Sequence, residues 1–227
     1  MRIAIVGSGK LAKALLYDLP EIDSGIKTEP WNASSNADVI IHAGSGNQFK
    51  EVISFCEAKK TPLIQASTLK ELQPPQKLSF VYVKAPNLSL PIVKFTYLLK
   101  QIRTLFPQAE KELIESHQAT KTTFAGTAKC IADASGLEAS LIQSIRDVGV
   151  QKDLGIPEEH LESHALHILT VEEDDATLTF STNVYGTRTY SIGAAKIAHS
   201  CLLLEPGVFE VIDLIEKGAL LGSNALA

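Results

Sequence analysis

The densest group of chemically active side chains lies in residues 112–128, which read Glu-Leu-Ile-Glu-Ser-His-Gln-Ala-Thr-Lys-Thr-Thr-Phe-Ala-Gly-Thr-Ala. An expected strand delivers His117, and an imidazole is the side chain that most often donates a proton in catalysis. Lys121 follows four residues later and brings a localised positive charge for an anion. Gly126 and Thr127 open an expected helix, where backbone N–H groups and a hydroxyl suit a carboxylate. Together these groups fit the reduction of a small acidic imine.

The same residues also fit a structural interpretation. In that interpretation 118–127 is a surface loop, Lys121 is an ordinary exposed lysine and Thr127 caps the following helix. Residue types and spacing do not separate the two interpretations.

A glycine turn near the N-terminus indicates a second binding site. Residues 2–6 form a short apolar run that stops at Gly7-Ser8-Gly9, and a helical pattern follows over 10–19, closed by Pro20. A strand, a glycine turn and a helix N-terminus form the usual cradle for a dinucleotide pyrophosphate, although a plain strand–helix turn has the same pattern. Glu29, at the end of the next expected strand, favours NAD through the ribose hydroxyls, whereas Lys10 permits NADP.

The elements that must position these residues follow two different patterns. Strands alternate with helices over the first 85 residues, which predicts a doubly wound parallel sheet. The expected strands there are 2–6, 25–29, 37–42, 62–65 and 80–83, with a helix over 47–58. After residue 87 the pattern becomes α+β with an antiparallel hairpin. The elements expected there are helices 89–106, 126–135, 138–147, 191–204 and 207–217, strand 112–115, a loop over 148–161, and hairpin strands 163–171 and 176–184 joined by the acidic tip 172–175.

These patterns predict an α/β protein with a Rossmann-like domain and a smaller α+β domain for substrate binding and oligomerisation. The expected boundaries are 1–87 for the dinucleotide-binding domain, 88–196 for the second domain, and 197–227 for a helical return to the first.

Composition narrows the class of protein. The chain has 227 residues and a formal net charge of −5, which argues against nucleic-acid binding. No apolar run approaches the roughly 18 residues of a membrane span, and the first residues read as a strand rather than a leader, so we expect a cytoplasmic location and no membrane contact. The three cysteines lack metal-ligand spacing, and His164 and His167 fall on opposite faces of one strand, so no metal is expected.

The 112–128 segment resembles the signature of the dihydrodipicolinate reductase (4-hydroxy-tetrahydrodipicolinate reductase) family, Glu-[Leu/Ile]-x-Glu-x-His-His-x-x-Lys-x-Asp-x-Pro-Ser-Gly-Thr-Ala. The residues kept are Glu112, Glu115, His117, Lys121, Gly126, Thr127 and Ala128. Segments 66–68, 85–89 and 188–194 resemble further family motifs in the same order along the chain.

The resemblance implies reduction of 4-hydroxy-tetrahydrodipicolinate to tetrahydrodipicolinate with NADPH or NADH, in lysine and diaminopimelate biosynthesis, by a homotetramer. It makes His117 the general acid and Lys121 the group that binds and polarises a small dicarboxylate, which Gln118, Gly126 and Thr127 help to hold. The implied cofactor-binding residues are Gly7, Gly9, Lys10, Leu11, Glu29, Gly44, Ala66, Thr68, Ala85 and Asn87.

The segment also departs from the family pattern. Gln118 replaces the second histidine, Ala119 stands where the family often has arginine, and 121–127 lacks the Asp, Pro and Ser and is one residue shorter. These changes leave less positive charge for a dianion. Two alternatives therefore stay open: a related reductase of another small keto or imino acid, and a catalytically silent nucleotide-binding regulatory paralogue.

Overall fold

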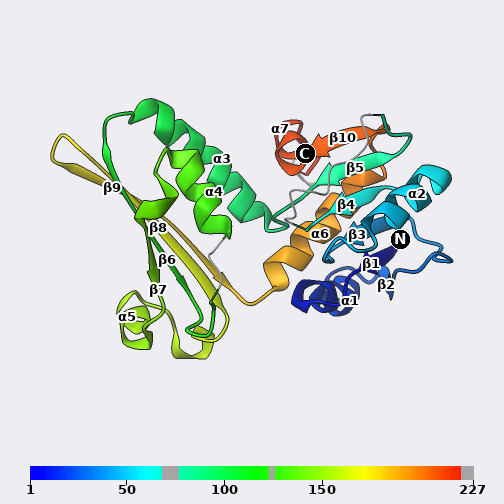
Figure 1. Ribbon diagram of the computed structural model, residues 1–227, viewed down its shortest axis with the longest axis horizontal. Coiled ribbons are helices and arrows are strands. Elements are labelled where there is room, and N and C mark those ends of the chain that lie inside the picture. Colours follow the sequence, from blue (N-terminus) through cyan, green and yellow to red (C-terminus); the bar gives the residue numbers. More distant parts are fainter. Residues whose placement is uncertain (68–76, 123–125, 221–227) are drawn as a thin grey trace. The chain divides into compact units, whose positions relative to one another are not determined.

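The computed structural model describes residues 1–67, 77–122 and 126–220, and the chain divides into two compact units (Figure 1). The first unit comprises Met1–Val93 and Thr187–Ala227, and the second comprises Lys94–Gly186. None of the helices in the described ranges combines the length and the apolar character that a membrane crossing demands.

The first unit is built on a six-stranded sheet in the order β10-β5-β4-β3-β1-β2, in which every neighbouring pair is parallel. Its strands are β1 (Arg2–Val6), β2 (Lys27–Pro30), β3 (Val39–His42), β4 (Leu63–Gln65), β5 (Val81–Lys84) and β10 (Gly207–Glu210). Its helices are α1 (Lys10–Ile22), α2 (Phe49–Lys59), α6 (Arg188–Cys201) and α7 (Val211–Glu216). This architecture confirms the predicted Rossmann-like domain.

Helices cover both faces of this sheet because successive strand residues point to opposite sides. Ile3 and Ile5 of β1 belong to a core cluster with residues of α1, α6 and α7. Ala4 and Val6 belong to a second cluster with residues of α2. Since both faces are buried there, the inner strands β1 and β3 are mostly continuous apolar runs, which is why they could be predicted from the sequence.

The sequence predicted that the first helix ends at Pro20. Helix α1 instead continues through Pro20 to Ile22. Proline lacks the N–H that would bond the carbonyl of Leu16 four residues earlier. The hydroxyl of Thr28 on β2 donates to that carbonyl at 2.7 Å. A tertiary hydrogen bond therefore compensates for the bond that Pro20 cannot make.

The second unit has a four-stranded mixed sheet in the order β7-β6-β8-β9, with β6–β7 parallel and the other two pairs antiparallel. Its strands are β6 (Glu110–His117), β7 (Ile142–Ile145), β8 (His164–Glu173) and β9 (Ala176–Tyr185), and its helices are α3 (Leu90–Leu105, which begins in the first unit), α4 (Gly126–Ser135) and α5 (Val148–Asp153). Short 3-10 turns occupy Ala139–Leu141 and Glu158–His160. The predicted hairpin is confirmed, and its tip turns at Asp174 and Asp175, both with positive φ.

Three local predictions were wrong. The expected helix over 138–147 is a 3-10 turn followed by β7, and residues 207–210 form β10 instead of the first turn of a helix. Each of these strands gains its hydrogen bonds from a partner distant in sequence, β6 or β5. Residues 148–153, expected as loop, form α5, because the side chain of Asp147 caps that helix by accepting from Val150 N–H.

Candidate functional site

In the first unit, the predicted cofactor residues gather at one edge of the sheet. Gly7 directly follows β1, Gly44 comes two residues after β3, and Ala66 and Ala85 directly follow β4 and β5. These strands are parallel, so their carboxyl ends meet at the same edge. That edge is where open α/β sheets bind ligands.

Gly7 and Gly9 of the turn are glycines for different physical reasons. Gly7 has φ +123°, and a Cβ there would lie 2.7 Å from the carbonyl oxygen of Ala43, so the fold itself requires glycine. Gly9 has φ −74°, and a Cβ there would meet nothing within 4 Å, so the fold does not require it. The open space over Gly9 is what a phosphate approaching the backbone needs.

The start of helix α1 also suits an anion. Gly9 is its N-cap and makes no side-chain cap bond, and the first turn carries no acidic residue. The exposed Lys10 opens the helix and adds positive charge beside the first N–H groups. A dinucleotide phosphate therefore fits the residues present, and Gly9 and Lys10 would hold it.

The remaining predicted cofactor residues are less uniform in position. Leu11 lies in the first turn of α1 and packs against the core. Glu29 lies within β2 opposite Ala4, before the end of the strand. Asn87 accepts a hydrogen bond from Ser89 N–H through its side-chain oxygen at 2.9 Å. Thr68 lies outside the described residues.

In the second unit, the candidate proton donor His117 lies on one face of the mixed sheet. Leu113, Glu115 and His117 alternate along β6 and therefore share a face. Leu113 belongs to the same core cluster as Ala128 and Ile131, so helix α4 covers that face. Because α4 begins at Gly126, the predicted carboxylate-binding pair opens a helix on the side of the sheet that carries His117.

A buried carboxylate lies against His117. Glu115 is fully buried, and its Oε2 lies 2.6 Å from Nδ1 of His117. Arg146 donates from Nη2 to Oε1 at 2.7 Å and from Nη1 to Oε2 at 3.2 Å, and the Ser144 hydroxyl donates to Oε1. Both carboxylate oxygens are thus held by charged and neutral donors.

The charge of this carboxylate follows from its surroundings. Burial raises the pKa of Glu115, but hydrogen bonds from His117, Arg146 and Ser144 outweigh it and hold the pKa at about 2. An ionised carboxylate only accepts hydrogen bonds, so Nδ1 of His117 carries a proton and Nε2 is the nitrogen free for chemistry. The His117 side chain is 13% exposed, so the ring is held but not sealed from solvent.

The same network reaches the loop that carries Lys121. Arg146 donates from Nε to the Lys121 carbonyl at 3.3 Å, and Lys121 N–H donates to the Gln118 carbonyl at 2.9 Å. Gln151 donates from Nε2 to the His117 carbonyl at 2.7 Å. The structure therefore fixes the main chain of both candidate catalytic residues.

The predicted carboxylate cradle is open at its glycine. A Cβ on Gly126 would meet nothing within 4 Å, and Gly126 is exposed while Thr127 is half-buried. An open helix start leaves room for an anion to approach the backbone.

A second histidine lies against His117. The ring centroids of His117 and His167 are 5.6 Å apart with the planes at 81°, and His167 faces Glu115 across the β6–β8 pair. Burial lowers the pKa of His167 to about 4, with a further lowering from the charge of His117, so His167 is neutral at physiological pH. His164 points to the other face, where its Nε2 lies 2.9 Å from the Ser116 hydroxyl.

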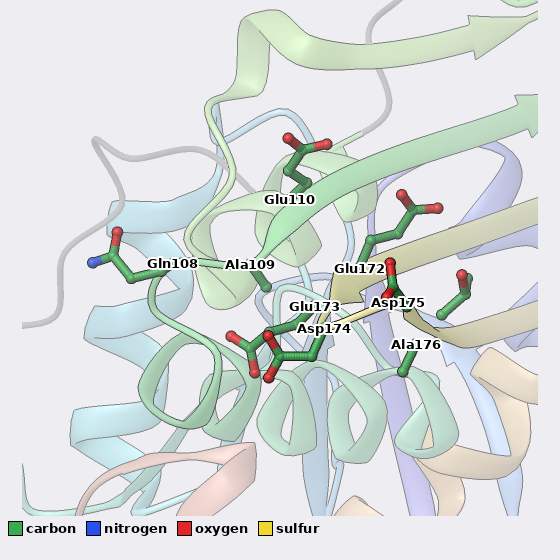
Figure 2. Close-up of a pocket in the computed structure, with 9 residues that line it drawn as sticks. Gln108, Ala109, Glu110, Glu172, Glu173, Asp174, Asp175 and Ala176 are labelled. Carbon is green, nitrogen blue, oxygen red and sulfur yellow. The ribbon is translucent and has the colours of Figure 1, made fainter.

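A separate pocket at the tip of the hairpin has the wrong charge for a dicarboxylate (Figure 2). Its lining is Gln108, Ala109, Glu110, Glu172, Glu173, Asp174, Asp175, Ala176 and Thr177. Five carboxyl groups without a cation among the lining residues would repel a dianion. Within the described ranges, no group of three or more His, Cys, Asp or Glu side chains could hold a metal ion.

The residues that hold His117 in place were not predicted from the sequence. Arg146 was assigned to a helix, and Glu115 was given no role although it belongs to the quoted motif. The alternation of Leu113, Glu115 and His117 was an available signal, because it places an acid on a core face where it needs a cation.

The first unit has a fold typical of NAD(P)-binding oxidoreductases, and the second presents a histidine held by a buried carboxylate. No protein-family model matches the chain. It is a distant homologue of the 4-hydroxy-tetrahydrodipicolinate reductases, as the resemblance had predicted.

Two relatives show how low the sequence identity is. A probable 4-hydroxy-tetrahydrodipicolinate reductase 2 of the chloroplast from Oryza sativa subsp. japonica is 30% identical over 153 residues, covering 60% of this chain and 47% of the rice protein. The 4-hydroxy-tetrahydrodipicolinate reductase of Rickettsia peacockii (strain Rustic) is 25% identical over 182 residues, 74% of each chain. The match thus spans about half the length of the rice relative.

Solved structures support the fold. The dipicolinate-bound dihydrodipicolinate reductase from Paenisporosarcina sp. TG-14 superposes with a TM-score of 0.69 at 16% identity, covering 94% of this chain and 99% of that one. A probable dehydrogenase from Thermotoga maritima superposes with a TM-score of 0.52 at 11% identity, covering 97% and 94%. At these identities the similarity establishes the fold alone.

Proposed function

We propose that the chain is an NAD(P)H-dependent reductase that converts 4-hydroxy-tetrahydrodipicolinate to tetrahydrodipicolinate in lysine and diaminopimelate biosynthesis. Distant homology to reductases of that name supports the proposal. The observation that carries it is the 2.6 Å contact between the fully buried Glu115 carboxylate and Nδ1 of His117, which leaves Nε2 for proton transfer.

The overall reaction consumes the substrate, NAD(P)H and one proton, and yields tetrahydrodipicolinate, NAD(P)⁺ and water. A reduced nicotinamide supplies the hydride when bound. His117 is the residue we assign to proton delivery, because its ring is oriented by a carboxylate through Nδ1–H. The ring must then carry a second proton on Nε2, taken up from solvent, and that proton is the one it gives to the substrate. Lys121 supplies positive charge for the substrate, and Gly126 with Thr127 offers the N–H and hydroxyl donors for one carboxylate.

The cofactor and substrate residues lie in different units of the chain. Gly7, Gly9 and Lys10 belong to the first unit, and His117 and Lys121 belong to the second. Whether the cofactor is NADPH or NADH is part of the test, because Lys10 and Glu29 favour different answers.

A coupled assay tests this function. Dihydrodipicolinate synthase generates the substrate in the cuvette, and the absorbance of NADPH or NADH is followed after the purified chain is added. The proposal predicts cofactor oxidation that requires the synthase. No oxidation with either cofactor, together with tight cofactor binding, would contradict it and favour the silent regulatory paralogue.

A second candidate is a reductase of another small keto or imino acid. Gln118 and Ala119, the two residues that follow His117, carry no charge, which favours a substrate with one carboxylate over a dianion. Binding of pyridine-2,6-dicarboxylate, a planar product mimic, separates the two candidates. Tight binding in the presence of cofactor supports the dicarboxylate, and no binding supports the monoacid.

Assembly and location are further parts of the proposal. We infer a homotetramer in the cytoplasm, with the open face of the second sheet as the contact surface. On that sheet Thr179, Ser181 and Asn183 of β9 are exposed, so the strand has a face without covering helices. Light scattering after size-exclusion chromatography should give the mass of four chains, and a monomer would contradict this inference.

A further inference from the structure

A single guanidinium group connects both candidate catalytic residues. Arg146 holds Glu115 with two hydrogen bonds, and Glu115 in turn contacts the ring of His117. Arg146 also donates directly to the main-chain carbonyl of Lys121 at 3.3 Å. The proton donor and the predicted substrate cation thus share one support.

Arg146 is itself held in place by the main chain. Arg146 donates from Nη1 to the carbonyl of Ile145 at 2.7 Å, at the end of β7. Strand β7 pairs in parallel with β6, with Ser144 opposite Glu115. The strand pairing therefore sets Arg146 and the Ser144 hydroxyl against the two oxygens of Glu115 before any substrate binds.

The geometry of the pair is specific. A planar guanidinium that bonds both oxygens of a carboxylate restricts its rotation far more than a point charge does. With the carboxylate fixed, Oε2 accepts from Nδ1 of His117 as well as from Arg146 Nη1, which selects the ring tautomer and orients the ring. The sequence separation between Glu115 and Arg146 makes this a tertiary device, not a property of the local motif.

We propose that Arg146 is a positioning residue for the reaction, which acts on His117 through Glu115 and on Lys121 through its main chain. Neither Arg146 nor Glu115 touches the reacting atoms in this scheme. The inference rests on the proposed function for its kinetic consequence, but its structural consequence, the state of the His117 ring, can be measured without turnover.

The first test is the imidazole spectrum of His117. Long-range ¹H–¹⁵N NMR on the full chain, assigned by the signals lost in His117→Gln, reports which ring nitrogen carries the proton when the ring is neutral. We expect the Nδ1–H form in the wild type and a mixture of tautomers in Glu115→Gln, because an amide can donate as well as accept. Glu158→Gln removes the acid of an exposed ion pair with Lys152 in the same unit and is the matched control, with an unchanged spectrum.

The second test is kinetic. Arg146→Met should lower kcat on the order of a hundredfold, as misplacement of a reacting group does, with the KM for cofactor unchanged. Arg146→Lys should recover only part of the rate, because an ammonium group cannot form the paired hydrogen bonds to both carboxylate oxygens of Glu115. Since both residues act through the same ring, the double variant Glu115→Gln/Arg146→Met should be about as slow as the slower single variant.

The outcomes are separable. An Nδ1–H ring that persists in Glu115→Gln, or losses in rate that multiply in the double variant, would overturn the positioning role. If Arg146→Met does not fold, Arg146→Lys carries the kinetic test, because it keeps a cation beside the buried carboxylate, and a wild-type rate in that variant would overturn the positioning role. The expected spectra without any reductase activity would contradict the proposed function alone.

Discussion

The ionised Glu115 should make the folded protein sensitive to acid in a defined range. Its pKa is about 2 in the folded state, against an ordinary value of 4.5. A folded-state pKa below the unfolded one means that the stabilisation is fully present above pH 4.5 and is lost as the pH falls toward 2. The difference of 2.5 pKa units corresponds to on the order of 3 kcal/mol at 1.36 kcal/mol per unit.

Urea unfolding at a series of pH values measures this contribution. The free energy of unfolding of the wild type should fall by on the order of 3 kcal/mol more than that of Glu115→Gln between pH 4.5 and 2. Glu112→Gln, which removes an exposed acid on the same strand, is the control and should follow the wild type. Parallel curves for wild type and Glu115→Gln would refute the account of the buried carboxylate.

Further predictions concern the buried histidine and three glycines. The His167 pKa of about 4 lies below the ordinary 6.5, so the free energy of unfolding of the wild type should fall by on the order of 3 kcal/mol between pH 6.5 and 4. His167→Phe should abolish that fall in the same unfolding series. An equal fall in the variant would contradict the account of His167. Gly9→Ala should weaken cofactor binding about tenfold, measured by calorimetry, and leave the unfolding midpoint unchanged, whereas Gly7→Ala should lower the midpoint. A lower midpoint in Gly9→Ala with unchanged cofactor binding would show that the turn serves only the fold. Gly193→Ala should destabilise the protein by several kcal/mol in urea, because its Cβ would clash with the carbonyl oxygen of Leu88. A variant as stable as the wild type would contradict the close packing of α6 on Leu88.

The parts of the fold that could be predicted are those whose sequence pattern is local. Buried parallel strands such as Val39–His42 are continuous apolar runs, and the hairpin strands are long and end at an acidic turn. The strands Ile142–Ile145 and Gly207–Glu210 are four residues each, and they exist because a partner strand offers its hydrogen-bonding edge. Four residues carry too little periodicity to distinguish a strand from one turn of helix.

The same division applies to the site. His117, Lys121 and Gly126 lie within ten residues, so their spacing was enough to predict a common site. Arg146 lies 31 residues from Glu115, and only the pairing of β7 with β6 brings them together. His167 was predicted only to lie on the first hairpin strand, and its contact with His117 follows from the register of β8 against β6.

The assignment of His117 as proton donor is tested most directly by the coupled assay on His117→Gln beside the wild type. The substitution removes the imidazole but keeps a polar side chain, and the predicted cofactor residues Gly7, Gly9 and Lys10 lie in the other unit. We predict a fall in kcat of about a hundredfold or more, the usual contribution of a positioned acid, with the cofactor dissociation constant unchanged. A rate equal to that of the wild type would remove His117 from the reaction and contradict the proposed mechanism.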